Sequence, residues 1–431
     1  MRKVVIVGGG VAGMGAAQRL VAAGCDVTLF ESLPRLGGDC FGVDVQLPGR
    51  GVVRVDAGVS DFNQETFVRL KALLDELRLD YHPIVQDCCF MTPTGEALYH
   101  FRDGRLKADW PEAEVTRLRS EVERFNTECV EVLEGGDTFA DWTLVHYLHE
   151  RGYSTSFADL YVYPRAMGCF PMPDEDPALY PVRSLVAFWH MHGVVGRHDR
   201  APRMCVTGGM HRYCAAMERW LEDRGGRILR ATRVVGVVRR ASGIEVRAIT
   251  RDDEHLAFRA DHVLFATNPN EVLPLLEDST SDEVAAFSGF SYQRARLVVH
   301  LDARLMARDR QTWGAYNYVV SVGGGPEVKP TITFYPNLMG RLPERVPDVF
   351  VTMNPHLEPD PEVVVSNRFF EHPVANGKTT QAVARLERIQ GERGTWFSGS
   401  YLQEPFLHEQ ALVSGQDIAE RLLRADPHAG R

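Results

Sequence analysis

The feature that most constrains the fold of this chain is a glycine-rich turn near its N-terminus. Residues 4–7 form a β-branched apolar run, which predicts a strand buried on both faces of a sheet. The turn that follows matches G-x-G-x-x-G through Gly8, Gly10 and Gly13. In this motif the first glycine permits a tight turn, the second lets the backbone approach a pyrophosphate, and the third brings a helix close to the strand. Residues 12–23 have helical composition, so the turn opens a helix whose N-terminus can bind phosphate.

The residues after this helix strengthen the prediction of a dinucleotide site. A second apolar run at 27–30 ends in Glu31, which stands where a carboxylate accepts the hydroxyls of a ribose. Strand, turn, helix, strand and acid therefore occur in the order of a dinucleotide-binding Rossmann unit. This pattern predicts an α/β fold, and at this point it leaves open whether the dinucleotide is NAD or FAD.

The composition excludes several classes of function. A chain of 431 residues is long enough for two domains. The formal net charge of −10 argues against a nucleic-acid partner, which usually requires a basic patch. No run approaches the roughly 20 apolar residues of a membrane-spanning helix, and the apolar run after the first three residues is too short for a signal peptide. The eight cysteines contain no C-x-x-C pair, so we expect reduced thiols, no metal site and a cytoplasmic location.

The next motif decides between the two dinucleotides. It reads E-x-x-x-R-x-G-G, with Glu31, Arg35, Gly37 and Gly38 at the defined positions. This run resembles the flavin amine oxidase and carotenoid (phytoene) desaturase superfamily, and the order of motifs is most similar to a bacterial branch of predicted NAD/FAD-binding oxidoreductases. The resemblance implies FAD, with the glycine pair against the ribityl-pyrophosphate and the arginine supporting the phosphates. The D-A-G turn that ends at Gly58 is similar to the next flavin-proximal element.

The resemblance extends over nearly the whole chain and implies further cofactor contacts. Two short strands within 230–249 are expected to bring backbone to the adenine, and a buried strand over 261–267 to close the FAD sheet. A C-terminal strand, turn and helix resembles the element whose helix N-terminus faces the flavin. The cofactor residues predicted in this way are Gly8, Gly10, Val11, Ala12, Gly13, Glu31, Ser32, Arg35, Gly37, Gly38, Gly58, Val234, Val235, Ala266, Thr267, Gly399, Ser414 and Gly415. FAD should be bound non-covalently, because no cysteine follows Cys214.

The resemblance also implies a domain organisation. A Rossmann-like FAD-binding domain of the glutathione-reductase type is expected from residues 1–60, 203–290 and 385–431. A discontinuous α+β substrate domain is expected from residues 61–202 and 291–384. The FAD domain would thus be assembled from three separate segments of the chain.

Catalytic residues are harder to predict, because the flavin itself performs the redox step. Many amine oxidases of the superfamily hold a lysine near flavin N5; the strand expected here, over 296–300, has none, and Arg296 takes that place. Arginine cannot act as a base but can stabilise an anionic reduced flavin, which favours C–C dehydrogenation or isomerisation over amine oxidation. His408 and Glu409 precede the last helix, where His408 either shuttles a proton or only packs on the flavin. Residues 405–411 depart from the turn of the bacterial branch, which predicts a reshaped pocket floor.

Aromatic and methionine-containing segments are the remaining pocket candidates. Trp396 and Tyr401 either wall the flavin or belong to the core. The aromatic cluster at 313–318 is more typical of a core than of a pocket. Residues 163–173 are apolar and irregular, which suits an adaptable hydrophobic pocket or, equally, a buried loop.

Together these features predict an FAD-dependent oxidase, dehydrogenase or desaturase. It would remove hydride from a C–C or C–N bond of a small or lipid-like apolar substrate, and oxygen or another acceptor would reoxidise the flavin. Two alternatives stay open. One is a redox-neutral double-bond isomerase, and the other is a flavin-bound protein that has lost its catalysis and serves as a binding partner.

Overall fold

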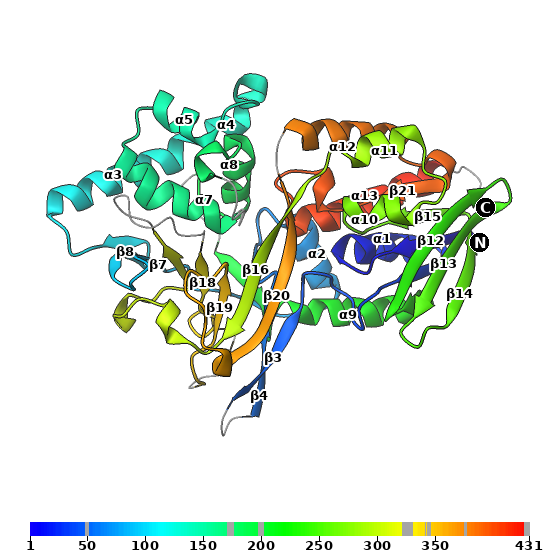
Figure 1. The fold of residues 1–431 in the computed structure, drawn as a ribbon, viewed down its shortest axis with the longest axis horizontal. Helices are drawn as coiled ribbons and strands as arrows, with labels where there is room; N and C mark the ends of the chain where they lie inside the picture. The colour runs from blue at the N-terminus through cyan, green and yellow to red at the C-terminus, as the bar shows by residue number, and fades with distance from the viewer. Residues whose placement is uncertain are drawn as a thin grey trace.

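The computed structural model describes residues 1–47, 51–169, 176–196, 202–320, 331–340, 342, 346–374 and 377–425. Figure 1 shows two lobes. One lobe combines the N-terminal segment in dark blue, the green strands and the C-terminal helix in red. The other combines the cyan and blue-green helices with yellow and orange strands, and two long strands run between the lobes.

The first lobe is built on a five-stranded parallel sheet. Its strands, in spatial order, are β11 (Arg227–Leu229), β2 (Asp26–Phe30), β1 (Lys3–Val7), β15 (His262–Phe265) and β21 (Thr395–Phe397). The helix α1 (Val11–Ala22) connects β1 to β2. Segments far apart in the sequence therefore meet in one sheet, and the parallel pairing confirms the predicted Rossmann-type α/β fold.

Alternate residues of β1 face two different hydrophobic clusters. Val4 and Ile6 join a cluster with residues of α1, α9 (His211–Glu222) and α13 (His408–Ala425). Val5 and Val7 join a cluster on the other face. That face is covered by β12 (Thr232–Arg240), β13 (Gly243–Thr250), β14 (His255–Ala260), α10 (Pro269–Leu275), α11 (Ser281–Phe287) and α12 (Gly377–Ile389). A strand buried on both faces explains why its sequence is uniformly apolar.

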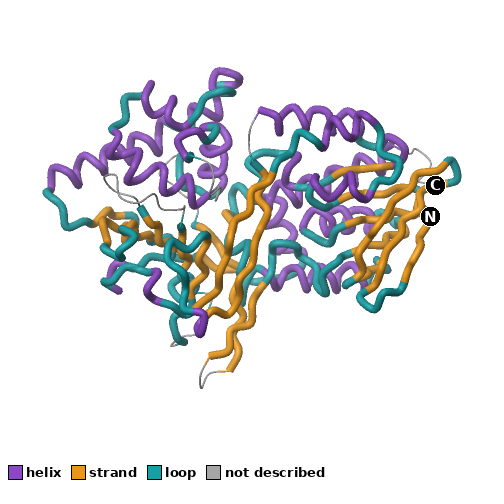
Figure 2. Tube along the Cα trace, viewed as in Figure 1, coloured by secondary structure: helices purple, strands orange, loops and turns teal. Residues whose placement is uncertain are grey.

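The second lobe contains an eight-stranded mixed sheet and a group of helices. In spatial order the strands are β20 (Val364–Pro373), β16 (Tyr292–His300), β19 (Phe350–Met353), β18 (Ile332–Phe334), β17 (Tyr316–Val319), β7 (Cys88–Met91), β8 (Ala97–Arg102) and β9 (Arg105–Lys107). The helices are α3 (Glu112–Glu128), α4 (Glu131–Glu134), α5 (Leu144–Glu150), α6 (Thr155–Phe157), α7 (Tyr163–Cys169) and α8 (Val182–Met191). Figure 2 shows these helices gathered on one side of the strands.

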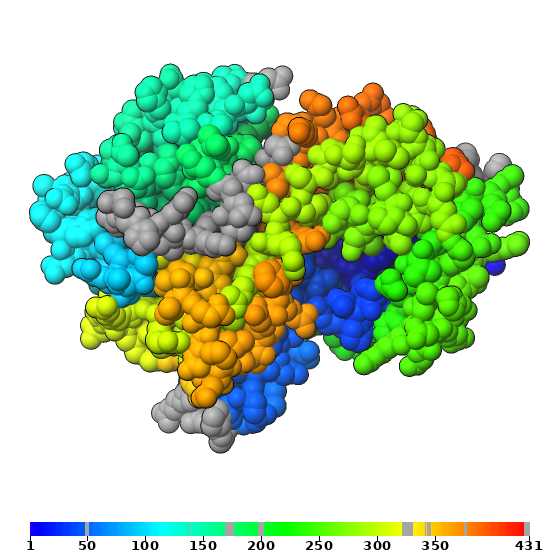
Figure 3. Space-filling view, in the orientation of Figure 1, coloured from blue at the N-terminus to red at the C-terminus, as the bar shows by residue number. Residues whose placement is uncertain are grey.

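Shorter elements link the lobes. They are the hairpin β3 (Gly42–Leu47) and β4 (Gly51–Asp56), the three-stranded sheet of β5 (Phe62–Asn63), β10 (Arg203–Val206) and β6 (Tyr81–Pro83), and helix α2 (Val68–Glu76). In the space-filling view, the N-terminal segment in dark blue lies at the bottom of a hollow between light green and blue segments (Figure 3).

One predicted segment differs from the expectation. Residues 163–169 form the helix α7 instead of an irregular loop, and residues 170–173 lie outside the described part of the chain. The helix packs closely on the sheet, because a Cβ at Gly168 would approach the ring of Tyr318 within 2.7 Å. Packing against β17 thus overrides a local composition that does not favour helix.

Candidate active site

The N-terminal glycine turn packs tightly against the protein at Gly8 and Gly13 and leaves free space at Gly10. Gly8 has φ +104°, and an added Cβ there would lie 2.6 Å from the carbonyl oxygen of Ala266. A Cβ on Gly13 would fall on the carbonyl oxygen of Gly8. At Gly10, by contrast, no atom of the described residues lies within 4 Å of the added Cβ. The backbone therefore leaves free space at the position where the motif brings a pyrophosphate close.

The N-terminus of α1 faces this free space with unneutralised backbone dipoles. No side chain caps it, and its first turn contains no acidic residue. Such a helix end offers N–H groups and a partial positive charge to a phosphate. The turn thus fits the pyrophosphate of a bound FAD.

Glu31 is held beside the same turn. Its carboxylate accepts hydrogen bonds from the backbone N–H of Gly9 at 2.8 Å and of Leu33 at 2.7 Å, and Ser32 donates its hydroxyl to it at 3.2 Å. The backbone of Glu31 is also bonded to Thr232, at the start of the strand that carries the predicted adenine contacts at 234–235. A buried acceptor in this place fits the hydroxyls of a ribose.

The second glycine pair lies against the first turn. The N–H of Gly37 donates to the carbonyl oxygen of Gly9 at 2.9 Å, and a Cβ on Gly38 would lie 3.2 Å from the Cα of Gly10. The guanidinium of Arg35 donates to the carbonyl oxygen of Gly38 at 3.0 Å. Arg35 therefore holds the glycine pair in place, and its contact with a phosphate stays a prediction.

The turn at Gly58 is supported by a buried carboxylate. Asp56 accepts hydrogen bonds from the backbone N–H of Met210 at 2.8 Å and pairs with Nδ1 of His211 at 2.7 Å. A Cβ on Gly58 would fall on the carbonyl oxygen of Asp39, so only glycine lets the two segments meet. The predicted flavin-proximal turn is thus fastened to the start of α9.

The C-terminal helix reaches the glycine turn. The N–H of Gly399 donates to Oγ of Ser414 at 3.0 Å. A Cβ on Gly415 would fall on the carbonyl oxygen of Ala12, so α13 packs against α1 in backbone contact. Ala266 lies on the opposite side of the turn, with its N–H bonded to the carbonyl of β1 at Val7. The structure therefore brings the predicted cofactor segments from both chain ends together.

His408, at the start of α13, lies close to the second glycine pair. Its Nε2 is hydrogen-bonded to the hydroxyl of Tyr213 at 2.6 Å, and the neighbouring Cys214 contacts Gly37. Burial lowers the pKa of His408 to about 4 and raises that of Tyr213 well above its usual value. Both groups are therefore neutral at physiological pH.

Two predicted catalytic residues have other roles. Glu409 accepts hydrogen bonds from the backbone N–H groups of Arg69 at 2.7 Å and Leu70 at 2.9 Å. Its carboxylate thus caps α2, because a buried helix N-terminus requires acceptors. Arg296 forms a two-armed ion pair with Glu358, with both N–O distances 2.7 Å.

Arg296 lies on the face of β16 that is opposite to Leu297. Neighbouring residues of a strand point to opposite sides of a sheet. It is Leu297 that packs with Phe41 and Ala57, next to the flavin-proximal turn. Arg296 therefore points away from that turn.

Trp396 and Tyr401 were predicted either to wall the flavin or to belong to the core. Both are buried in hydrophobic clusters, with 4% and 3% exposure.

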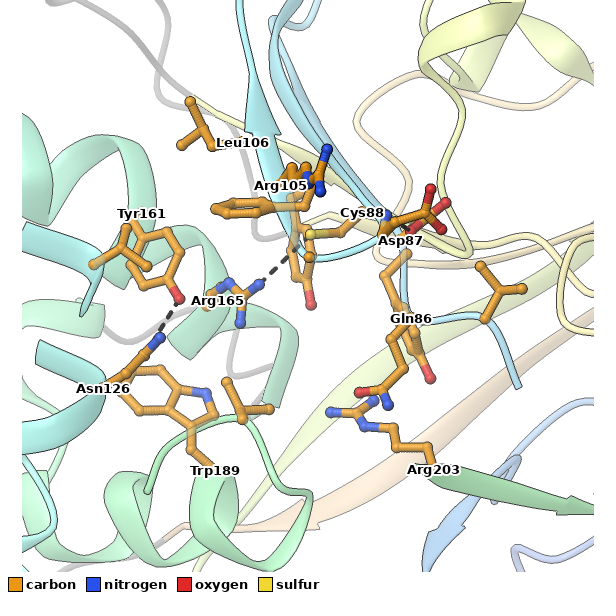
Figure 4. A pocket seen from close by; sticks show the side chains of 18 of the residues that line it. Gln86, Asp87, Cys88, Arg105, Leu106, Asn126, Tyr161, Arg165, Trp189 and Arg203 are labelled. Carbon is orange, nitrogen blue, oxygen red and sulfur yellow. Dashed lines mark hydrogen bonds between the residues drawn. The ribbon is translucent and has the colours of Figure 1, made fainter. Parts of the chain in front are cut away.

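A cavity of about 960 Å³ lies in the second lobe, between its helices and its sheet (Figure 4). Its aromatic lining comes from Phe101, Tyr161, Trp189, Tyr316 and Tyr318. The volume is at the upper end of that of sites for small molecules. Two tyrosines of the predicted 313–318 cluster therefore line a pocket, whereas Trp313 belongs to the core.

The cavity adjoins the flavin-proximal turn. Asp61, three residues after Gly58, accepts a hydrogen bond from the hydroxyl of Tyr316 at 3.2 Å and lies 3.7 Å from the guanidinium of Arg203. Both partners of Asp61 line the cavity. Sequence reasoning missed Arg203 and Arg165, and no motif marks either of them. The spacing of Tyr161 and Arg165, one helical turn apart, was the only available signal.

Comparison with known proteins identifies the family of this chain. Residues 11–301 match the family model of flavin-containing amine oxidoreductases. The chain belongs to this family. This flavin amine oxidoreductase is also 25% identical over 394 residues to hydroxyneurosporene desaturase from Cereibacter sphaeroides, across 79% of this chain and 70% of that protein.

Solved structures share the fold of this flavin amine oxidoreductase. Putrescine oxidase bound to putrescine superposes with a TM-score of 0.69 at 16% identity, covering 98% of this chain and 99% of that one. A CLA-producing fatty acid isomerase from P. acnes superposes with a TM-score of 0.66 at 15% identity, covering 97% and 98%. Both likenesses concern the fold alone.

Membership of the family establishes the class of cofactor and reaction. The flavin amine oxidoreductase is an FAD-dependent oxidoreductase, as the sequence predicted. In the described part of the chain, no helix is long and apolar enough to cross a membrane. No cluster of three or more potential metal ligands occurs among the same residues.

Proposed function

We propose that this enzyme dehydrogenates a C–C bond of an apolar or lipid-like substrate bound in the second-lobe cavity. The observation that carries the proposal is the charge of the cavity lining. Its basic side chains are Arg105, Lys107, Arg119, Arg165 and Arg203. Its acidic side chains are Asp87, Asp103 and Glu123. An excess of positive charge repels a protonated amine, so a substrate without a cationic centre suits this cavity better.

The apolar part of the lining supports the same substrate class. Tyr318 lines the cavity and stacks on the buried Phe90, which stacks on Tyr99 behind it, with ring centres 4.9 and 4.5 Å apart. Tyr161 and Trp189 lie on the helical side. Stacked aromatic rings bury large apolar areas and exclude water. A hydrocarbon chain is therefore bound by its surface, with one end free to reach the flavin-proximal turn near Asp61.

Dehydrogenation removes a hydride and a proton from adjacent carbons. The glycine turns at Gly8–Gly13 and Gly37–Gly38 would hold FAD, which would supply the hydride acceptor and would be reoxidised by oxygen or another acceptor. His408 is the chain's candidate for receiving the proton, because it begins the C-terminal helix and its Nε2 is hydrogen-bonded to Tyr213, the neighbour of the Cys214 that contacts Gly37. Asp56 and Glu409 position the two segments that carry these groups.

The test is anaerobic mixing of the FAD-loaded enzyme with matched substrates. The panel contains hydroxylated polyenes, long-chain acids and alcohols, and the amines putrescine and cyclohexylamine. Lasting loss of the flavin's visible absorption with a polyene or long-chain compound, and none with amines, is the expected result. Reduction by amines alone would refute the proposal. Turnover without lasting bleaching would instead identify an isomerase, and binding without any reaction an inactive partner protein.

A matched pair of variants connects the reaction to the cavity. Cys88 lines the cavity and is buried, so Cys88→Leu places extra volume in it. Cys25 lies outside the cavity lining and serves as the control in Cys25→Leu. Flavin reduction should be lost in the first variant and kept in the second, at equal FAD content. Equal rates in the two variants would place the substrate elsewhere.

A further inference from the structure

Arg165 is a charged side chain of the cavity that has no charged partner among the described residues. Figure 4 shows it between Tyr161 and Cys88. Its Nε is buried and has no hydrogen-bond acceptor, and its terminal nitrogen makes only a 3.5 Å contact with Sγ of Cys88. Among the described residues, no carboxylate lies within ion-pair distance of Arg165. Arg203, the other half-buried arginine of the cavity, has Asp61.

The surroundings of Arg165 compensate its charge only in part. Its guanidinium lies 4.6 Å from the ring centre of Tyr161 and about 6 Å from those of Phe90 and Phe101. Cation–π contacts of this kind contribute modestly compared with an ion pair. Arginine stays protonated in proteins, and this half-buried charge has no ion-pair partner among the described residues. The site therefore has an electrostatic preference for an anion.

We infer that Arg165 binds the carboxylate of the substrate, so that the enzyme acts on an apolar carboxylic acid. The position of the reacting carbon rests on the proposed function, whereas the binding of the carboxylate by Arg165 does not. A planar guanidinium matches a carboxylate with two parallel hydrogen bonds. The other polar groups nearby, Asn126 and the hydroxyl of Tyr161, are neutral and bonded to each other at 3.5 Å. The guanidinium of Arg165 carries one positive charge, which matches the single charge of a carboxylate.

The position of Arg165 also orients the substrate. The residue is held on α7, and Tyr161 lies one turn earlier on the same face. The apolar lining continues from there along Tyr318 and Tyr316 to Asp61, beside the flavin-proximal turn. An acid anchored at Arg165 therefore directs its hydrocarbon end towards the flavin, and the carboxylate stays remote from the reacting carbons.

Calorimetric titration of the FAD-loaded enzyme tests the inference without any turnover. The probes are saturated carboxylates from hexanoate to hexadecanoate, with the alcohol, amine and phosphate ester of the best chain length. We expect the carboxylate to bind about tenfold or more tightly than the alcohol, as for a charge-assisted hydrogen bond. Arg165→Gln should remove this advantage while leaving alcohol binding unchanged. Arg165→Lys should restore part of this advantage, because lysine supplies the positive charge but not the two parallel N–H donors of a guanidinium.

The matched control is Arg117→Gln, which removes an exposed arginine of α3 that does not line the cavity. It should bind the acid as the wild type does. The visible flavin spectrum of each variant verifies that it is folded. Equal affinity for acid and alcohol, tighter binding of the amine or the phosphate ester, no binding of any probe, or an unchanged Arg165→Gln variant would each overturn the inference.

The result also separates this inference from the proposed function. If acids bind through Arg165 but no compound reduces the flavin, the carboxylate site stands and the proposed dehydrogenation fails. If uncharged compounds reduce the flavin but the wild type binds acids no more tightly than alcohols, the proposed function stands and the carboxylate site fails.

Discussion

Replacing Gly10 by alanine should weaken FAD binding without destabilising the protein itself. A Cβ added at Gly10 has no atom of the described residues within 4 Å, and the backbone φ of −68° suits alanine. The free energy of unfolding of the FAD-free protein should therefore change by less than about 0.5 kcal/mol. The added methyl group instead enters the space in front of α1, where the pyrophosphate is expected.

The size of the effect follows from overpacking. Inserting a methyl group into an occupied space costs about 1–3 kcal/mol, which corresponds to a roughly 5- to 150-fold higher Kd for FAD. The matched control is Gly13→Ala, whose Cβ would fall on the carbonyl oxygen of Gly8. Because one backbone segment must then move away from another, the FAD-free protein should lose about 3 kcal/mol of stability.

The assay has two measurements on protein stripped of flavin. Denaturant unfolding gives the stability of each variant, and titration with FAD, followed by flavin fluorescence, gives its Kd. Gly10→Ala should change only the second quantity, and Gly13→Ala should change the first. The reasoning is refuted if Gly10→Ala binds FAD as tightly as wild type. It is equally refuted if the two variants lose the same stability without FAD.

Three further predictions concern residues outside the glycine turn. Glu409→Gln leaves one acceptor for two N–H groups of α2, so unfolding free energy should fall by about 1–3 kcal/mol with an unchanged flavin spectrum; an unchanged melting temperature would contradict the capping role. Arg296→Gln breaks an exposed ion pair, so the unfolding free energy should fall by less than about 1 kcal/mol. A tenfold slower flavin reduction would instead indicate that Arg296 acts at the flavin. Burial lowers the pKa of His300 to about 4, against about 6.5 when unfolded. The unfolded state then binds more protons between these values, so stability is lost as pH falls below 6.5, by about 2 kcal/mol at pH 5. His300→Gln should flatten this dependence in denaturant unfolding measured from pH 7 to 5, and an equally steep profile would exclude His300 as its source.

Local motifs made the cofactor site predictable. The turn from Gly8 to Gly13 and the acid at Glu31 lie within one βαβ unit, in which consecutive residues impose the geometry. Gly13 is required by its close approach to the carbonyl oxygen of Gly8, a near neighbour in the sequence. Gly37 likewise contacts the first turn, through the bond from its N–H to the carbonyl oxygen of Gly9. Family resemblance then extended the prediction to the distant helix α13.

For two of the predicted catalytic residues, the contacts depend on which side of an element each one faces. For Arg296 and Glu409 the sequence position was close, but strand alternation and the packing of α2 against α13 decided the direction of each side chain. A shift of one residue along a strand moves a side chain to the opposite face. Such a shift leaves no trace in a single sequence.

The amino-acid sequence by itself determined the Rossmann unit, the choice of FAD and the class of reaction, because these depend on short contiguous patterns with strict backbone requirements. Only the tertiary structure determined the pocket. Arg165 looks like any other arginine in a sequence that contains many of them. It becomes a candidate anion receptor only because folding surrounds it with Tyr161, Phe90 and Phe101 and brings no described carboxylate to it. Charge compensation is a property of three-dimensional neighbours, and the chain order does not contain it.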